Sequence, residues 1–300
     1  MTANAAAISP PAVVDTVRSY VSLTKPRIIA LLLITTVPAM IVAEGGWPSG
    51  WLILVTVVGG TLSAGGANVI NCWYDRDIDG VMRRTRERPL VRGAIEPLNA
   101  LIFGIALGTG AFALLWAFAT PAAAILATLG LLFYVFVYTI WLKRRTPQNI
   151  VIGGAAGAFP PMVGWAAVTG DISWASVAMF ALIFLWTPPH FWALALRLKD
   201  DYGEAGVPML PVTHGPAHTR KQILAYSYVL VACSLVLAPL ASLGWMYVSV
   251  AALSGLLFIG LAHQLHRSPE TVSPMRLYKY SLLYLAIVFV AMGADVFVAV

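Results

Sequence analysis

Long apolar runs alternate with short polar segments along nearly the whole chain. Most runs are close to twenty residues long and nearly free of charge, enough for one helix to cross a hydrocarbon core of about 30 Å. Membrane barrels instead show short segments of alternating polarity. The pattern therefore predicts an all-α integral membrane protein with about nine transmembrane helices. The predicted spans are 28–43, 51–73, 99–117, 122–141, 150–169, 173–195, 222–243, 246–262 and 279–298.

The first residues form a different kind of segment. Residues 1–23 contain Asp15 and Arg18, and they lack the sustained apolar core and small-residue cleavage site of a secretory signal. We interpret residues 1–24 as a cytoplasmic N-terminal tail. One polytopic membrane domain is expected to follow over residues 25–300.

Positively charged side chains occur only in alternate loops. All 19 Lys and Arg residues precede the first predicted span or follow the second, fourth, sixth or eighth. Cytoplasmic flanks of membrane helices are enriched in Lys and Arg, so we predict a cytoplasmic N terminus and an outside C terminus. The loops without any Lys or Arg lie near 45–50, 119–121, 169–173 and 243–245.

Composition supports a membrane protein. With 59% hydrophobic residues, 11% charged residues and a mean hydropathy of +0.81, the chain is too apolar for a soluble domain of 300 residues. The net charge of +6 follows from the loop pattern and suits anionic lipid headgroups, so nucleic acid is not implied. Cys72 and Cys233 lie in or beside apolar spans and offer no disulfide framework or zinc spacing.

Polar side chains gather at the end of the second predicted span. Asn71, Asp75 and Asp79 are spaced four residues apart, which places them on one face of a continuous helix. Carboxylate and amide oxygens are ligands that suit Mg²⁺. Because acids at a membrane boundary are costly, this face is the first candidate for a metal site and for catalysis.

Arginines follow this acidic stretch at once. Arg83, Arg84 and Arg88 lie in the loop at about 74–98. Arg clamps phosphate oxygens, and Mg²⁺ is usually shared between carboxylates and phosphate, so the order is typical of a site for a metal-bound polyphosphate. An ordinary positively charged cytoplasmic loop is the alternative interpretation.

A second acidic cluster lies in the loop at about 196–221, on the same predicted side. Asp200 and Asp201 could hold another Mg²⁺ against the same diphosphate, and two metals would neutralise a leaving group. The alternative is a polar loop with Gly and Pro turns. We treat these two long loops as the candidate catalytic loops.

Several sequence blocks follow one another in a recognisable order. The stretch from Asn71 to Asp79 is followed by Arg-Thr-Arg-Glu-Arg-Pro-Leu-Val-Arg-Gly at 84–93. Further blocks lie at 23–27, 138–144, 148–154, 156–161, 186–194 and 205–211. Together they resemble the intramembrane aromatic prenyltransferases of the UbiA superfamily, and most closely its heme-modifying branch. The blocks cover residues 23–215, and the later spans match by layout.

This resemblance implies a bundle of nine helices around a central cavity. It also implies a Mg²⁺-dependent prenyltransferase in a bacterial cytoplasmic (inner) membrane, with its active site at the cytoplasmic face. The implied reaction transfers the farnesyl group of farnesyl diphosphate to a vinyl group of heme B, giving heme O and diphosphate. The implied partners are these two substrates and membrane lipid, with heme A synthase or oxidase assembly proteins as further ones.

The resemblance also implies roles for individual residues. Asn71, Asp75 and Asp79 match the superfamily's first motif and would be catalytic ligands of Mg²⁺, with Asp201 as a further catalytic and metal-binding acid. The implied contacts on the diphosphate side are Lys25, Arg83, Arg84, Arg88, Lys143, Arg144, Asp200 and Tyr202.

Two positions depart from the superfamily pattern. Cys72 stands where other members place an Asp directly after the motif Asn, and Arg197 stands four residues before Asp201, where others have an Asp. The heme branch resembles this chain in the second departure. The metal site is therefore expected to rest mainly on the first motif.

His190 is the candidate residue on the heme side. It lies in the sixth predicted span after Pro188 and Pro189, where a polar side chain is costly, and imidazole ligates heme iron. The alternative is a histidine that only satisfies helix carbonyls freed by the prolines. His214, in the loop after that span, could reach the heme propionates or iron.

Other residues have structural interpretations. We expect seven glycines to permit close helix packing instead of binding phosphate: Gly59, Gly60, Gly104, Gly108, Gly153, Gly154 and Gly157. Aromatic residues beside the predicted outer loops suggest an interfacial belt: Trp47, Trp51, Trp174, Trp245 and Tyr247.

Three other functions compete with heme farnesylation. A transporter could use intramembrane acids and proline-broken helices, although these acids cluster at one face and no internal repeat is visible. A quinone or phenolic prenyltransferase would keep the metal chemistry and change the acceptor. A heme-binding assembly factor would lack catalysis.

Overall fold

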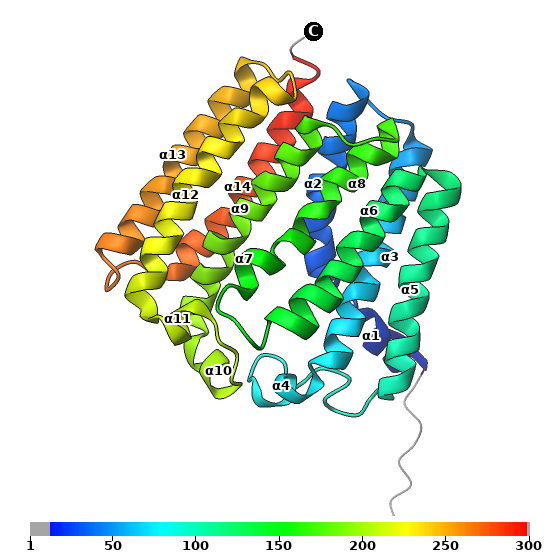
Figure 1. Cartoon of the computed structure of the whole chain (residues 1–300), viewed down its shortest axis with the longest axis vertical. Helices are drawn as coiled ribbons and strands as arrows, with labels where there is room; N and C mark the ends of the chain where they lie inside the picture. Colours follow the sequence, from blue (N-terminus) through cyan, green and yellow to red (C-terminus); the bar gives the residue numbers. More distant parts are fainter. Residues whose placement is uncertain (1–12, 299–300) are drawn as a thin grey trace, which may run out of the picture.

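The computed structural model describes residues 13–298, and over this range it consists of helices and connecting segments without strands. Figure 1 labels the helices. They are α1 Val13–Leu23, α2 Pro26–Glu44, α3 Gly50–Tyr74, α4 Arg76–Val81, α5 Pro97–Phe118, α6 Pro121–Leu132, the π-helix η1 Phe133–Leu142, α7 Asn149–Gly153, α8 Ala155–Thr169, α9 Trp174–Arg197, α10 Lys199–Glu204, α11 Leu210–Thr213, α12 Gly215–Leu240, α13 Trp245–Arg267 and α14 Pro274–Asp295.

The all-helical membrane class is confirmed. Within the described residues, eight helices are long and apolar enough to cross a membrane: α3, α5, α6 with η1, α7 with α8, α9, α12, α13 and α14. The helix α2 adds a shorter apolar stretch at Ile34–Glu44. The count of nine spans and the sidedness of the termini stay predictions.

Helix bounds differ from the predicted spans at several ends. The helix α13 runs to Arg267, not 262, and α14 begins at Pro274, not 279. The helix α12 begins at Gly215, not at 222, so Arg220 and Lys221 are helical and not part of a loop; α14 ends at Asp295, not at 298. An apolar run marks only the part of a helix that suits lipid. Proline in the first turn, as at the start of α12, lets the helix begin earlier in polar sequence.

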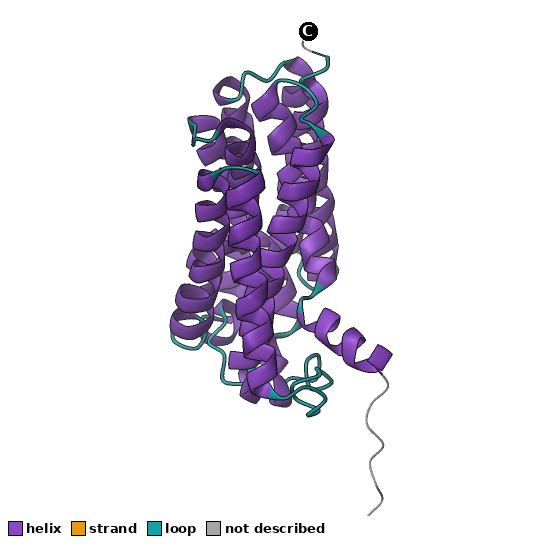
Figure 2. Cartoon of the chain, turned by 90° about the vertical axis from the view of Figure 1, so that its right-hand side faces the viewer, coloured by secondary structure: helices purple, strands orange, loops and turns teal. Residues whose placement is uncertain are grey.

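The long helices stand side by side, and the short helices α1, α4, α10 and α11 gather at one end of the bundle (Figure 1). We call this end, formed by α1, α4, α10, α11 and residues 82–96, the polar end. The described chain finishes at the opposite end. In Figure 2, α1 leaves the bundle at a steep angle to the long helices. Residues 1–12 of the predicted tail lie outside the described residues.

Small residues bring neighbouring helices into close contact. A Cβ added to Gly66 on α3 would lie 2.6 Å from the backbone oxygen of Gly104 on α5. The packing role is confirmed for Gly59, Gly104, Gly108, Gly153 and Gly154, where an added Cβ would lie within 3.0 Å of a neighbour. It is wrong for Gly60 and Gly157, which have open space within 4 Å of an added Cβ.

Large side chains fill the space among α9, α12, α13 and α14. Trp192, Tyr247, Tyr284 and Phe258 are among the largest fully buried residues. Tyr247 therefore does not belong to an interfacial belt, because its hydroxyl donates to the Ser234 carbonyl at 2.8 Å inside the core. The four tryptophans proposed for the belt are all exposed, as that role requires.

Candidate active site

Asn71, Asp75 and Asp79 lie at the polar end and are all buried, with 3%, 0% and 3% exposure. The single continuous helix predicted for them is wrong, because α3 ends at Tyr74 and α4 starts at Arg76. Backbone bonds from Asp75 N to Asn71 O at 2.9 Å and from Asp79 N to Asp75 O at 2.8 Å nevertheless preserve the four-residue spacing across the break.

Asn71 is held by hydrogen bonds on every side of its amide. Its Nδ2 donates to Asp75 Oδ2 at 2.7 Å and to Thr139 Oγ1 at 3.1 Å, and its Oδ1 accepts from Lys25 Nζ at 2.8 Å. These contacts fix the orientation of the amide, with the oxygen toward the lysine and the nitrogen toward the acid.

The π-helix η1 and the residue that follows it bring two polar side chains, Thr139 and Lys143, to this cluster. Thr139 Oγ1 donates to Tyr134 O at 2.8 Å, five residues back, while it also accepts from Asn71. Lys143, which follows directly, pairs with Asp75 Oδ2. π-helical segments are rare and often occur at functional sites, and here Thr139 contacts Asn71 while Lys143 pairs with Asp75.

Arg144 forms the densest ionic contacts of the site. Its two terminal nitrogens bind Asp77 at 2.6 and 2.7 Å, and one of them also reaches Asp75 Oδ1 at 3.3 Å. The guanidinium lies over the Tyr74 ring, 5.0 Å from its centroid. The hydrogen bond from Arg144 holds the pKa of Asp77 below its usual value.

Lys25 reaches the site from a strained backbone position. It is the residue before α2 and has a left-handed backbone with φ of 57°, which disfavours residues other than glycine. Neighbouring contacts hold this turn, since Asn68 Nδ2 donates to Thr24 O at 3.0 Å. Burial lowers the pKa of the Lys25 ammonium.

Arg88 completes the cationic ring around the first motif. Its Nη1 lies 2.5 Å from Asp79 Oδ2, and Thr85 Oγ1 donates to Asp79 O at 2.9 Å. Arg84 lies beside a cavity of about 240 Å³ next to this pair. That cavity is lined by Ser22, Leu23, Cys72, Arg84, Glu87, Arg88 and Pro89.

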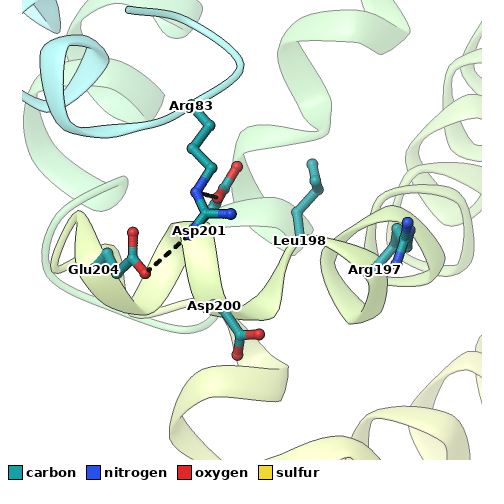
Figure 3. A pocket seen from close by; sticks show the side chains of 6 residues that line it. All are labelled: Arg83, Arg197, Leu198, Asp200, Asp201 and Glu204. Atoms are coloured by element: carbon teal, nitrogen blue, oxygen red, sulfur yellow. Dashed lines mark ion pairs between the residues drawn. The ribbon is translucent and has the colours of Figure 1, made fainter.

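The second acidic cluster forms another cavity, of about 430 Å³, around α10. Figure 3 shows Arg83 reaching from the loop after α4 toward Asp201 and Glu204 of α10, with 3.9 Å to each, while Asp200 points away from it. Arg83 thus connects the two predicted catalytic loops. Tyr202 is buried in the apolar core, with 8% exposure.

His190 lies apart from this polar cluster, in the packing between α9 and α14. Its ring is stacked between Trp186 and Tyr278, with centroid distances of 4.2 and 4.6 Å. Its Nδ1 is 2.6 Å from Ser281 Oγ, which itself donates to Tyr278 O at 2.7 Å. Within the described residues, the histidine is therefore satisfied by a serine of α14 and not by helix carbonyls.

His214 lies at the surface, directly before α12. Its Nδ1 is 2.8 Å from Thr213 Oγ1, and its ring centroid is 5.3 Å from that of His218. Both histidines are exposed. The start of α12 at Gly215 makes His218 helical, where the sequence suggested a loop.

The structure thus brings seven of the fourteen predicted site residues into one contact network. The members of this network among the predicted residues are Lys25, Asn71, Asp75, Asp79, Arg88, Lys143 and Arg144. Arg83 and Asp201 form a second, adjoining contact between the loops. In the part of the chain described, no hydrogen bond, ion pair or ring contact joins His190 or His214 to either group.

Sequence reasoning missed two members of the network, Thr139 and Asp77. Thr139 sits in an apolar run that predicts an ordinary α-helix, and composition gives no sign of a π-helix. Asp77 carried a signal, because it is an acid between two motif acids. Asn149, in α7, also belongs nearby: its Nδ2 donates to Lys143 O at 3.2 Å, and its buried Oδ1 has no hydrogen-bond partner among the described residues.

The donor chemistry of the network suits Mg²⁺. The described residues contain no group of three or more His, Cys, Asp or Glu side chains placed to hold a metal ion, so an all-acid cage is not present in this range. Mg²⁺ commonly uses only one or two carboxylates and takes its other ligands from phosphate and water. Asp75 and Asp79 supply two carboxylates, and Asn71 supplies an amide oxygen.

Comparison with known proteins identifies the family of this chain. A model of the UbiA prenyltransferase family matches residues 32–288. Proteins named protoheme IX farnesyltransferase from Parafrankia sp. (strain EAN1pec) and Clavibacter sepedonicus are 53% and 52% identical to this chain. Each alignment covers 93% of this chain, and they cover 90% and 92% of those two relatives.

Solved structures show the same fold. A structure from a study of digeranylgeranylglyceryl phosphate synthase in membranes has a TM-score of 0.77 at 21% identity. The match covers 94% of this chain and 99% of that one. A UbiA homolog from Archaeoglobus fulgidus bound to DMAPP and Mg²⁺ has a TM-score of 0.60 at 18% identity, covering 91% and 99%. With a family match over most of its length and relatives that share half its residues, the chain belongs to the UbiA prenyltransferase family.

Proposed function

We propose that the chain transfers the farnesyl group of farnesyl diphosphate to a vinyl group of heme B, giving heme O and releasing diphosphate. One observation carries this proposal: proteins named protoheme IX farnesyltransferase share about half of their residues with this chain over nearly its full length. The buried network of one amide, two motif acids and several cations provides the chemistry that such a transfer needs.

The diphosphate is the group that the network is built to hold. Asp75 and Asp79 would hold Mg²⁺ beside the diphosphate, where the metal would supply positive charge to offset the charge on the leaving group. Lys143, Arg144 and Arg88 lie against Asp75 and Asp79, within reach of any phosphate bound there. The Arg144 Nε is a buried donor without a partner among the described residues, which leaves it free for a phosphate oxygen.

The electrostatic role of these residues is to favour ionisation at the allylic carbon. As the bond from C1 of the farnesyl chain to oxygen breaks, negative charge grows on the diphosphate, and preorganised cations stabilise it. Lys25 approaches from the opposite side of Asn71 and adds a further charge. The farnesyl cation then adds to the terminal vinyl carbon, and water adds to the carbocation formed at the inner carbon and loses a proton, which gives the hydroxyethyl substituent.

The second loop has a supporting role in this proposal. Asp201 and Arg83 already face each other across the two loops, so a diphosphate could recruit the arginine while Asp201 binds a second Mg²⁺. Asp200 points away from Arg83, and Tyr202 is buried, so we expect smaller contributions from both.

On the heme side, His190 has the tautomer that iron ligation requires. Ser281 Oγ donates its single proton to Tyr278 O, so it accepts from His190 Nδ1–H, and Nε2 is left with a lone pair. A second hydrogen bond that fixes the tautomer is typical of ligating histidines. His214, exposed at the polar end, is proposed to meet the propionates as heme enters.

The proposed cellular setting follows from the charge pattern. Residues 25–300 form one domain in the bacterial inner membrane, with the polar end and both catalytic loops at the cytoplasmic face. Farnesyl diphosphate is charged and made in water, so a site at that face receives it without a charge crossing the membrane. Heme A synthase or oxidase assembly proteins would receive the product.

The decisive experiment is a reconstitution. Purified protein in liposomes is incubated with heme B, farnesyl diphosphate and Mg²⁺, and the pigments are analysed by mass spectrometry. We expect heme O in the complete mixture and none without Mg²⁺. A folded preparation that makes no heme O, or that prenylates a quinone precursor in its place, contradicts the proposed acceptor.

The role of His190 has its own test. We expect His190→Ala to shift the Soret band of bound heme and to lower turnover, because iron loses a ligand. Ser281→Ala, which removes the bond to Nδ1 while keeping the imidazole, should give a smaller change of the same kind. An unshifted Soret band with full turnover in His190→Ala would remove the ligand assignment.

A further inference from the structure

The short helix α1 presents three different faces. Val14, Val17 and Val21 recur at helical spacing and are 74%, 56% and 50% exposed, so one apolar face is uncovered. Asp15, Arg18 and Ser22 form an exposed polar face beside it. The third face packs on the bundle through Leu23, which is 1% exposed, and Tyr20.

The contacts of α1 place it at the boundary of the lipid-facing surface. The Tyr20 ring meets the Phe103 ring of α5 edge to face, with centroids 5.0 Å apart. Around that contact, α5 exposes Leu98 and Ile102, at 64% and 56%. Through Tyr20, α1 therefore adjoins an apolar face of α5, a helix that is long enough to span the membrane.

The direction of α1 also indicates that this helix lies along the membrane surface. Figure 2 shows it leaving the bundle at a steep angle to the long helices. A helix at such an angle to membrane-spanning neighbours runs along the membrane surface. Its apolar and polar faces are then divided between acyl chains and water, as in interfacial amphipathic helices.

We propose that α1 is a lipid-binding surface helix that seats its valine face in the headgroup boundary of the membrane. Anionic headgroups are the lipid chemistry that fits, because Arg18 lies on the adjoining face and Ser22 borders the cavity that contains Arg84 and Arg88. Basic residues near a membrane surface favour anionic lipids.

The contact between α1 and the membrane has a consequence for the active site, and this step rests on the proposed function. The end of α1 leads within two residues to Lys25, whose ammonium binds Asn71. The link is held by a few contacts, including Asn68 to Thr24 O and the Cys72 thiol near Leu23 O at 3.9 Å. With its valine face in lipid, α1 acts as a positioning element for the left-handed turn at Lys25.

Spin labels test the seat directly, without turnover. Val17→Cys and the matched control Asp15→Cys are labelled in a Cys233→Ser background, with the unlabelled-site background measured in parallel because Cys72 is buried. In liposomes containing phosphatidylglycerol, we expect the label at 17 to be accessible to oxygen and protected from a water-soluble nickel chelate, and the label at 15 to show the reverse. Equal aqueous access at both positions overturns the proposal, as does dipolar broadening between labels, which would show a second copy on this face.

Kinetics test the link to Lys25. Replacing all three valines by serine should raise KM for farnesyl diphosphate about fivefold with little change in kcat, the size expected from weakening one hydrogen bond. Replacing them by leucine should preserve KM, because the face stays apolar. The serine variant can show an unchanged KM while the label at position 17 remains lipid-protected in the Cys233→Ser protein. That result overturns the link between α1 and Lys25, but not the membrane contact of α1. Absence of heme O from wild-type protein would instead count against the proposed reaction.

Discussion

The carboxylate of Asp75 accepts from Asn71, Lys143 and Arg144 at once, although the residue is 0% exposed. A buried charge persists only when it is paired and hydrogen-bonded. Two cations and an amide satisfy this condition. Asp75 is therefore the residue on which the positions of the others depend.

We predict that Asp75→Asn lowers the rate of diphosphate release by about 10²–10³-fold, comparable to removing one preorganised electrostatic group in other enzymes. The amide keeps the shape but neither binds Mg²⁺ as an anion nor balances Lys143. Asp77→Asn is the matched comparison, because the Asp77 side chain is 60% exposed and, among the described residues, forms an ion pair only with Arg144; the variant should lose severalfold at most. Near wild-type release by folded Asp75→Asn refutes the metal assignment.

Much of the site was predictable at the level of residue type. Acids and arginines at a membrane boundary are costly enough to indicate function, and Lys25, Asn71, Asp75 and Lys143 do meet. Which atom pairs with which was not predictable, because that depends on a helix break at Asp75 and on the π-helical turn before Lys143. Neither feature has a composition of its own.

At the scale of elements, the contact between α3 and α5 depends on glycine. The backbones approach so closely at Gly66 and Gly104 that no side chain fits between them. Without a hydrophobic drive between helices in lipid, such van der Waals contact is a main source of association. Packing against α5 also positions the end of α3, which carries Asn71 in its last turn and Asp75 as its capping residue.

We predict that Gly66→Ala destabilises the fold by about 1–3 kcal/mol, because its Cβ would lie 2.6 Å from the Gly104 carbonyl oxygen. Gly60→Ala is the matched control on the same helix, where an added Cβ meets nothing within 4 Å. It should leave the thermal midpoint in detergent unchanged or slightly raised. Equal midpoints for the two variants would show that α3 and α5 can separate without cost.

Helices could be predicted from the sequence better than their ends or their irregular turns. Hydropathy located the long helices because lipid requires apolar side chains over a fixed length. It misplaced the start of α12, because polar residues can extend a helix into water. It also could not reveal α1, which has only eleven residues, about half of them apolar.

At the scale of the whole molecule, the polar end collects α1, α4, α10 and α11, while the described chain finishes at the other end (Figure 1). All Lys and Arg residues lie in segments that belong to the polar side in the predicted topology. In that topology, one membrane face would carry both the candidate site and the positive charge.

We predict that alkaline phosphatase fused after Val300 is active outside the cytoplasm, and that a fluorescent protein fused there fails to mature inside. The reason is the alternation of charged and uncharged loops, which one missed or additional span would break. Fusions truncated in the loop at 143–148 serve as the opposite control, since that loop carries three basic residues. A C-terminal reporter active only in the cytoplasm contradicts this topology.

The ion pairs around the first motif have a thermodynamic consequence. A divalent cation that arrives alone must displace Lys143 or Arg88 from its acid and leave it without a counterion, and a diphosphate that arrives alone meets cations already engaged. When both arrive, the acids and bases exchange partners and every charge stays balanced. Metal and substrate should therefore increase each other's affinity by the same factor, tenfold or more, as reciprocity requires. Calorimetry with a non-hydrolysable farnesyl diphosphate analogue measures both factors, and equal Mg²⁺ affinity with and without the analogue would show that the exchange does not occur.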